Sequence, residues 1–383
     1  MFDPLLPIPR PRPSSILLPL AWLTLACSAE PTETDSQHFA TFVTSESMNP
    51  GTSSSTGEDP SGGDGDGDPS SSGDGDGEGS TSQGSGDGDG DPRTTGDGDG
   101  EPDPDPEAWS FVALSDSRGS DNGIAAGVIG PMAEVIASLD PKPELVIYPG
   151  DLVDVGTQSQ LNAWLDAFAP VYDAGMAVYT VPGNHEDEAV GGWESLFSNG
   201  SPYQHPGAVG SPDGGRTYYV EHKNALFVGV GWGNYDTSWV EDTMQVHGAD
   251  KDHIVVFQHH PLVGAAANRE GVPNGGDLVT AMKSTGAQFY FAGHDHTTNH
   301  AAIDGGSVHQ WIVGMAGAPN YPATPYRWWG DDNPYSVQRV ENGVPDDAYA
   351  MVVVNVVGAS ASAYVVWWDQ ANEQWEVSPD GQY

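Results

Sequence analysis

The sequence predicts an α/β domain in which two β-sheets lie face to face with helices on their outer sides. Apolar runs of strand length alternate with amphipathic runs of helix length over residues 111–181, which is typical of parallel β-α-β units with right-handed crossovers. Further apolar runs after residue 217 provide strands for a second sheet. Polar clusters follow five of the expected strands, and ligands gather beyond the carboxyl ends of such strands. The expected architecture is a four-layer α/β/β/α sandwich of two mixed sheets.

The first half of the domain alternates strands with helices. Short apolar runs predict strands, and apolar residues at helical spacing predict helices. Pro131 and two glycines disturb the start of the first helix. The expected strands are 111–114, 144–148 and 177–181, and the expected helices are 124–139 and 161–172.

The second half begins with a polar insertion rich in Gly, Pro and Ser at 193–215. After it we expect strands at 217–221, 225–230, 253–258 and 288–292, and a short helix at 277–284. The apolar runs of the tail are expected to be hairpins that close the second sheet. They lie at 308–313, 350–357 and 363–368.

The formal charge of −43 is concentrated in one segment, because residues 58–107 contain seventeen acidic residues against the single Arg93. With almost no apolar side chains, Gly-Asp repeats cannot offset the entropy of ordering. We therefore expect a disordered acidic linker at 30–107 ahead of a folded domain at 108–383. Calcium binding by the repeats is the alternative. The acidity also excludes nucleic acid as a favoured partner.

The amino-terminal 29 residues have the layout of an export signal. Two arginines precede an apolar run at 16–26, which is too short to span a membrane. The only cysteine, Cys27, ends this run and resembles the lipidated residue of a bacterial lipoprotein, which predicts anchoring in the cell envelope, at the outer membrane or the cell surface. The alternative is plain secretion after cleavage behind Ala29. Without other cysteines, the mature domain is stabilised by its core and by metal.

The polar clusters provide the oxygen and imidazole donors that a catalytic pair of metal ions needs. Asp151 is the expected bridging carboxylate. Asp116 and His296 would complete the coordination of one ion. Asn184, His259 and His294 would complete that of the other. Mixed oxygen and nitrogen ligands accept manganese, iron or zinc. The clusters are Ser115-Asp116-Ser117-Arg118, Gly150-Asp151-Leu152-Val153-Asp154, Gly183-Asn184-His185-Glu186, His259-His260-Pro261 and Gly293-His294-Asp295-His296.

This ordered set resembles the calcineurin-like metallophosphoesterases, over residue 111 to about residue 317. Within that family, the pattern of aromatic and apolar residues between Trp193 and Gly229 is similar to that of the purple-acid-phosphatase-like branch. The resemblance implies a hydrolase of phosphate esters in which Asn184 binds both metal and substrate phosphate, with His259 also at the substrate. It further implies that His185 is the general acid that protonates the leaving oxygen, held by Asp154 or another nearby carboxylate.

Two positions depart from the family pattern. Arg118 stands where the family has a histidine, and a guanidinium cannot ligate a metal at ordinary pH. We expect Arg118 to contact either the substrate phosphate or Asp116, and a structural salt bridge is the alternative. Asp154 stands where the purple-acid branch has the tyrosine that gives the iron site its colour. A purple chromophore is therefore not expected.

The resulting expectation is an exported dimetal phosphoesterase that cleaves phosphate mono- or diesters by a metal-bound hydroxide. The alternative is a surface ligand-binding protein on the same scaffold, with catalysis weakened by Arg118. His260 is expected to pack rather than to ligate. His205 and His300 either reach the site or take exposed or capping positions. Trp232, Trp328 and Trp329 are candidates for a substrate cleft, and the loops 193–215 and 319–347 are expected to set specificity.

Overall fold

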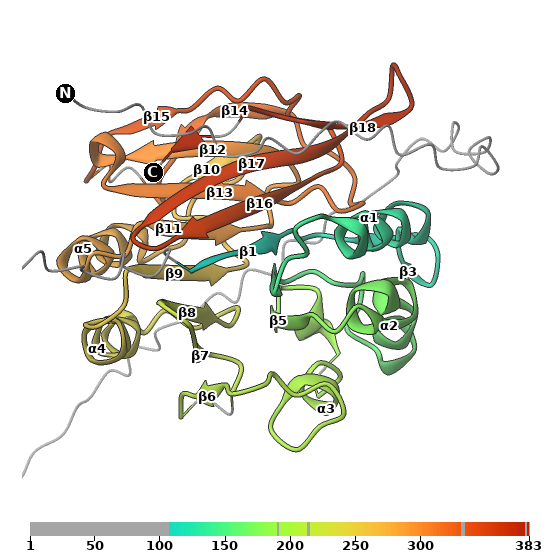
Figure 1. The fold of residues 1–383 in the computed structure, drawn as a ribbon, viewed down its shortest axis with the longest axis horizontal. Helices are drawn as coiled ribbons and strands as arrows, with labels where there is room; N and C mark the ends of the chain where they lie inside the picture. Colours follow the sequence, from blue (N-terminus) through green and yellow to red (C-terminus); the bar gives the residue numbers. More distant parts are fainter. Residues whose placement is uncertain (1–106, 190, 213–214, 331–333, 380, 383) are drawn as a thin grey trace, which may run out of the picture. The chain divides into compact units, whose positions relative to one another are not determined.

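The fold consists of two large mixed sheets flanked by helices (Figure 1), which confirms the predicted α/β/β/α architecture. The computed structural model describes residues 107–382 except 190, 213–214, 331–333 and 380. The predicted export signal at 1–29 with Cys27, and the acidic linker up to residue 106, lie outside the described residues. No helix in the described part is long and apolar enough to cross a lipid bilayer.

The first sheet combines strands from the two ends of the domain. They are β1 (Ala108–Ala113), β4 (Leu145–Pro149), β5 (Ala177–Val181), β16 (Ala350–Val357), β17 (Ser360–Asp369), β18 (Gln374–Val377) and β19 (Gly381–Gln382). Their order is β18-β17-β16-β1-β4-β5, with β19 paired to β17. β1, β4 and β5 are parallel, whereas β16 runs antiparallel to β1.

The second sheet is built from the middle of the chain. Its strands are β6 (Val209–Gly210), β7 (Tyr218–His222), β8 (Ala225–Val230), β9 (His253–Gln258), β11 (Phe289–Ala292), β12 (Thr298–Ile303), β13 (Val308–Val313) and β15 (Val337–Arg339). Their order is β15-β12-β13-β11-β9-β8-β7-β6. The four strands from β8 to β13 in this order are parallel.

Helices cover the outer face of each sheet. α1 (Ala126–Ser138) and α2 (Gln158–Asp173) share a buried cluster with the first sheet. α4 (Thr237–His247) and α5 (Gly275–Thr285) share another with the second sheet. Figure 1 shows these two helix pairs apart from each other. The remaining pieces are α3 (Glu194–Phe197) and the pairs β2 (Arg118–Gly119) with β3 (Gly123–Ile124) and β10 (Gly264–Ala266) with β14 (Ala323–Arg327).

The strands at the centre of the fold have apolar sequences because both of their faces are buried. In β1, Phe111 and Ala113 belong to the cluster between the sheets, whereas Val112 belongs to the cluster under α1 and α2. The same alternation separates Ile147 from Val146 in β4. Successive side chains of a strand point to opposite faces, so a strand between two layers needs an unbroken apolar run.

α4 and the position of one hairpin are among the features of the fold that differ from the sequence prediction. α4 was not expected, because its only buried side chains are those of Val240, Thr243 and Met244, which make a weak apolar stripe. The hairpin of β16 and β17 was expected in the second sheet, but β16 pairs with β1 in the first. The pairing partner of a strand is set by packing rather than by local sequence.

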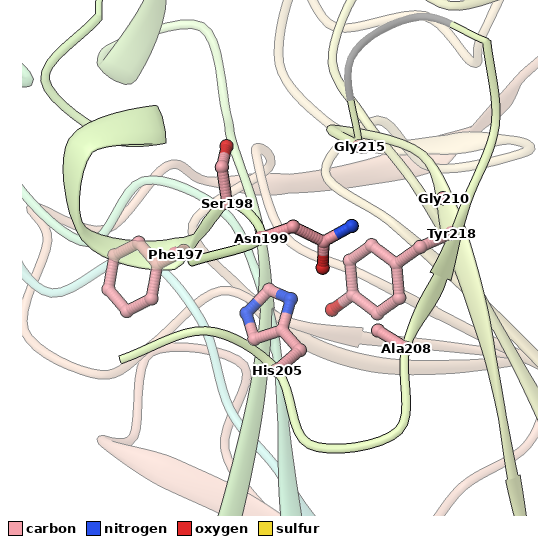
Figure 2. A pocket seen from close by; sticks show the side chains of 8 residues that line it. All are labelled: Phe197, Ser198, Asn199, His205, Ala208, Gly210, Gly215 and Tyr218. Atoms are coloured by element: carbon pink, nitrogen blue, oxygen red, sulfur yellow. The ribbon is translucent and has the colours of Figure 1, made fainter. Parts of the chain in front are cut away.

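Two histidines whose positions the sequence analysis left undecided, His205 and His300, lie in the core. His205 is 5% exposed and its Nε2 accepts a hydrogen bond from the Thr180 backbone N–H at 3.1 Å. Beside Phe197 and Tyr218, it lines a small pocket (Figure 2). His300 is 1% exposed and stacks on Trp311 at 3.8 Å between ring centroids. Neither histidine has the exposed position that the sequence left open.

Candidate metal centre

All six predicted ligands follow the carboxyl ends of strands that neighbour one another within each sheet. In the first sheet β1, β4 and β5 are neighbours, and in the second β9 and β11 are neighbours. Parallel neighbours end at the same edge of a sheet, so the segments that follow them meet. These segments carry Asp116, Asp151 and Asn184 from the first sheet, and His259, His294 and His296 from the second.

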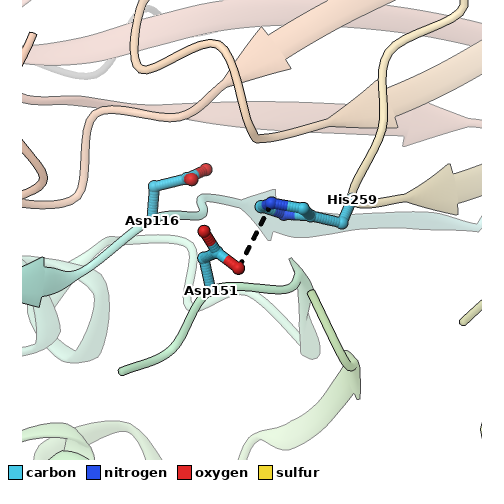
Figure 3. A group of neighbouring side chains, drawn as sticks. All are labelled: Asp116, Asp151 and His259. Atoms are coloured by element: carbon cyan, nitrogen blue, oxygen red, sulfur yellow. Dashed lines mark ion pairs between the residues drawn. The ribbon is translucent and has the colours of Figure 1, made fainter. Parts of the chain in front are cut away.

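Three of these side chains form a compact buried cluster (Figure 3). One donor atom from each of Asp116, Asp151 and His259 lies within 4.8 Å of the other two. The His259 Nε2 is 3.3 Å from Asp151 Oδ1. Each of the three residues is at most 1% exposed. Two carboxylates buried this closely need positive charge beside them.

The remaining predicted ligands surround this cluster. The Asn184 Oδ1 lies 3.2 Å from both His259 Nε2 and His294 Nδ1, and these two nitrogens are 3.3 Å apart. On the other side, His296 Nε2 lies 3.3 Å from Asp116 Oδ1. The structure therefore places Asn184, His259 and His294 together on one side and Asp116 and His296 on the other.

Backbone carbonyls fix the orientation of two imidazoles. His259 Nδ1 donates to the Pro149 carbonyl at 2.8 Å, and His296 Nδ1 donates to the Pro319 carbonyl at 2.7 Å. Because a carbonyl oxygen only accepts, Nδ1 carries the proton in the neutral form of each ring, and in that form the Nε2 lone pair faces the cluster. Such contacts hold a metal-binding histidine in the tautomer that coordinates.

The electrostatics agree with a cation site. Burial would raise the pKa of Asp151, but His259 and His185 outweigh it and the net shift is downward. Burial lowers the pKa of His259, but Asp151 and Asp116 raise it to about 9. The cluster thus stabilises positive charge, and its donors are carboxylate, amide oxygen and imidazole nitrogen. Donors of these kinds are suited to bind transition-metal ions.

Glu186 links two of the ligand loops, a role that sequence reasoning missed. It is 2% exposed, and its Oε2 accepts from the backbone N–H of Asp151 at 2.9 Å and of Gly183 at 2.8 Å. Its Oε1 accepts from the Val153 N–H at 3.2 Å. Burial and the nearby Asp151 raise the pKa of Glu186. Its place in the Gly-Asn-His-Glu cluster was the available signal, but only the fold shows what it holds.

The ligand loops have an unusual backbone. Asp116, Asp151, His294 and His296 all have positive φ, at 63°, 50°, 69° and 43°. Non-glycine residues rarely adopt this conformation, and it occurs mainly at functional sites. The loops also approach closely, because a Cβ on Gly293 would overlap Asp116 and Ser115. Gly293 is thus required for a close approach between these loops.

His185 lies at the edge of the cluster. Its Nδ1 donates to the Asp154 backbone carbonyl at 2.6 Å, and its Nε2 lies 3.8 Å from Asp151 Oδ2. The nearest carboxylate to Nδ1 is that of Glu188, at 3.6 Å. The contact with Asp154 therefore differs from the expected one, since it uses the main chain. The Asp154 carboxylate instead faces Arg118, with NH1 and Oδ1 3.6 Å apart.

Two arginines and a tyrosine border the cluster. Arg118 donates through NH2 to Tyr321 Oη at 3.2 Å, and its Nε lies 3.5 Å from His296 Nε2. The guanidinium of Arg269 lies 3.1 Å from His294 Nε2 and 4.8 Å from the centroid of the Tyr321 ring. Arg118 therefore pairs with Asp154 rather than with Asp116. Sequence reasoning missed Arg269 and Tyr321, because neither lies in a motif.

Among the tryptophan candidates, Trp232 alone contacts histidines predicted to be ligands. Its ring centroid lies 5.6 Å from that of His259 and 5.3 Å from that of His294. It also stacks on His260, whose Nε2 donates to the Glu270 carbonyl at 3.1 Å. Burial lowers the pKa of His260 to about 3, so this imidazole packs as a neutral ring. Trp328 is buried in the cluster under α4 and α5, and Trp329 is 44% exposed.

Residues 113–298 match the family model of the calcineurin-like phosphoesterases. No curated protein matches the chain.

Solved structures with a similar fold include the purple acid phosphatase PPD1 from yellow lupin (Lupinus luteus) seeds. The two share 14% identity at a TM-score of 0.50, over 72% of this chain and 54% of the lupin chain. This chain thus spans about half the length of the lupin protein, and at this identity the likeness concerns the fold alone. GAP50, the anchor in the inner membrane complex of Plasmodium, shares 13% identity at a TM-score of 0.49, over 71% of this chain and 88% of GAP50.

Proposed function

We propose that this chain, whose residues 113–298 form a calcineurin-like phosphoesterase domain, hydrolyses phosphate mono- or diesters with two bound metal ions. The observation that carries the proposal is the buried convergence of donor atoms from Asp116, Asp151 and His259 within 4.8 Å. The family supports a phosphoester hydrolase in general. The metal pair, its identity as manganese, iron or zinc, and the ester cleaved are the proposed part.

In this proposal Asp151 is shared between the two ions. Asp116 and His296 complete one of them, and Asn184, His259 and His294 complete the other. Bound there, the ions would polarise the phosphoryl group and lower the pKa of water at the site. The Asn184 amide has a second function, since its oxygen faces His259 and His294 and its NH₂ group is left to donate to a phosphate oxygen.

His185 supplies the proton to the leaving oxygen. Its Nδ1–H is engaged by the Asp154 carbonyl at 2.6 Å, so Nε2 is the nitrogen that exchanges a proton with the substrate. The side chain is 17% exposed, which leaves it accessible to an ester oxygen. Arg118, whose guanidinium also lies beside the cluster, would bind a phosphate oxygen.

Replacing a ligand tests the proposal directly. We expect Asp151→Asn and Asn184→Ala to lose more than about 100-fold in the hydrolysis of 4-nitrophenyl phosphate, and to lose bound metal by elemental analysis. Asp304→Asn is the matched control, because this surface carboxylate pairs with Lys283 at 2.5 Å and should leave both unchanged. Full turnover in both ligand variants would refute the proposal.

One observation favours a second function, a ligand-binding protein with weakened catalysis. The Arg118 Nε lies 3.5 Å from His296 Nε2, and a permanent positive charge there competes with a cation bound by Asp116 and His296. Metal stoichiometry separates the two proposals. Two ions per chain with turnover support the enzyme, whereas one or none, with phosphate ester bound but not cleaved, supports the binding protein.

We also propose that the chain is exported and anchored in a bacterial envelope through lipidated Cys27, on the strength of the apolar run that Cys27 ends. Expression with a radiolabelled fatty acid should label the wild type and leave Cys27→Ser unlabelled. A mature protein that begins after Ala29 and carries no label would instead support plain secretion.

A further inference from the structure

Arg269 differs from the other arginines of the described residues. Arg118, Arg216, Arg327 and Arg339 each have a carboxylate within the 4.0 Å of an ion pair. Within the described part of the chain, Arg269 has none. The chain has 55 acidic residues against 12 Lys and Arg, so an arginine without a carboxylate partner is unusual here. A partly buried guanidinium of this kind is a ready anion site.

The position of Arg269 indicates which anion it would bind, because it lies beside the proposed metal centre. It lies in the turn after β10, where its backbone N–H donates to the Ala266 carbonyl at 3.2 Å. Its side chain reaches His294, one of the proposed ligands, at 3.1 Å. The neighbouring carboxylate of Asp295 forms no ion pair with Arg269 in the described structure: its Oδ2 accepts from the backbone N–H groups of Ala265 and Ala266, and its Oδ1 is buried without a hydrogen-bond partner. The free charge of Arg269 therefore lies at the border of the metal centre.

Tyr321 joins Arg269 to the second guanidinium. Arg118 donates to its hydroxyl at 3.2 Å, and Arg269 lies 4.8 Å from its ring centroid. The Tyr321 ring in turn stacks on His296 with centroids 4.4 Å apart, and its backbone N–H donates to the His296 carbonyl at 3.2 Å. Tyr321, in the loop before β14, thus contacts two guanidiniums at the border of the cluster, one beside His294 and one beside His296.

The number of charged oxygens on the substrate decides what such a pair recognises. Beside the leaving oxygen, a phosphate monoester has three oxygens and two negative charges above about pH 6. A diester has two such oxygens and one charge, and its third position carries an organic group. In the proposed centre, two metal ions would already hold oxygens of the phosphoryl group of either ester. A guanidinium pair at the same site matches the additional charged oxygen that only the monoester provides.

We infer that Arg269, together with Arg118, binds the non-leaving oxygens of a phosphate monoester dianion, and that monoesters rather than diesters are the substrate class. This inference rests on the proposed hydrolytic function.

Comparison of two chromogenic esters tests the inference. The wild-type protein as purified should cleave 4-nitrophenyl phosphate with a higher kcat/KM than bis(4-nitrophenyl) phosphate. Arg269→Gln should lower the monoester value by about 10- to 100-fold and the diester value by less than about 3-fold. Arg327→Gln is the control, because this guanidinium pairs with Glu270 at 2.6 Å and should change neither value. Equal losses on both esters, or no loss in Arg269→Gln, would overturn the inference.

A binding measurement separates this inference from the proposed function. Isothermal titration with inorganic phosphate and with dimethyl phosphate needs no turnover. Arg269→Gln should weaken phosphate binding by about 10-fold or more and leave dimethyl phosphate binding unchanged, and Arg269→Lys, which keeps the charge, should retain part of the preference. If the wild type cleaves neither ester, the hydrolytic proposal fails and this titration still decides the role of Arg269. Unchanged phosphate affinity in Arg269→Gln overturns it.

Discussion

His205 should make the domain less stable in mildly acidic solution. The imidazole is buried between α3 and β7, and its Nε2 accepts the Thr180 backbone N–H at 3.1 Å. A proton on Nε2 would remove this acceptor and leave a charge in an apolar environment, beside Phe197 and Tyr218. Burial accordingly lowers the pKa of His205 to about 3.

The magnitude follows from the difference between the folded and unfolded states. The unfolded chain takes up the proton near the ordinary pKa of about 6.5, before the folded domain does. The contribution of neutral His205 is therefore complete above about pH 6.5 and declines by about 1.4 kcal/mol for each pH unit below it. Between pH 7 and pH 5 the loss is about 2 kcal/mol.

Urea unfolding, followed by tryptophan fluorescence at pH 7 and pH 5, measures this loss. His205→Gln keeps an acceptor for Thr180 but does not titrate, so its free energy of unfolding should fall by about 2 kcal/mol less than that of the wild type. His247→Gln is the comparison for a surface imidazole, since this side chain of α4 is 33% exposed and pairs with Glu221. An identical pH dependence in His205→Gln and the wild type would refute the reasoning.

Two further predictions concern the ligand loops. Glu186→Ala leaves three backbone N–H groups without their acceptor and should cost at least about 3 kcal/mol in the free energy of unfolding; an unchanged urea midpoint would show that Glu186 does not hold the loops. Manganese or zinc at about 100 times its Kd should stabilise the wild type by about 2.7 kcal/mol in a thermal unfolding assay. The same stabilisation should occur in Asp304→Asn but not in Asp151→Asn, and equal shifts in both variants would contradict a role for Asp151 in metal binding.

The sequence predicted the parts of the fold that have a local cause. Strands buried on both faces need continuous apolar runs, so β1, β4 and β9 were expected within a few residues of their observed bounds. α4 was missed because it presents few apolar side chains to the core. The position of β16 beside β1 depends on a contact between the two ends of the domain, for which a local pattern carries no signal.

In the candidate site too, the residues in local motifs were predicted, whereas those that depend on distant contacts were not. The six predicted ligands lie in short motifs behind strands, and the parallel order of those strands is enough to predict that they meet. Arg269 and Tyr321 come from loops whose spacing to the motifs is not fixed by any local rule. The contact of His185 with the Asp154 backbone, rather than with its carboxylate, was equally beyond the sequence, because identical residues can be joined through either group.

The positive φ values at Asp116, Asp151, His294 and His296 lower the stability of the fold, whereas the side chains at these positions serve the candidate site. Each such conformation costs of the order of 1 kcal/mol for a residue with a Cβ, and glycine would adopt it without that cost. A selection for thermal stability alone should therefore accept glycine at these positions and discard the ligands. The aspartates and histidines that remain there mark the place where the molecule gives up stability to keep a function.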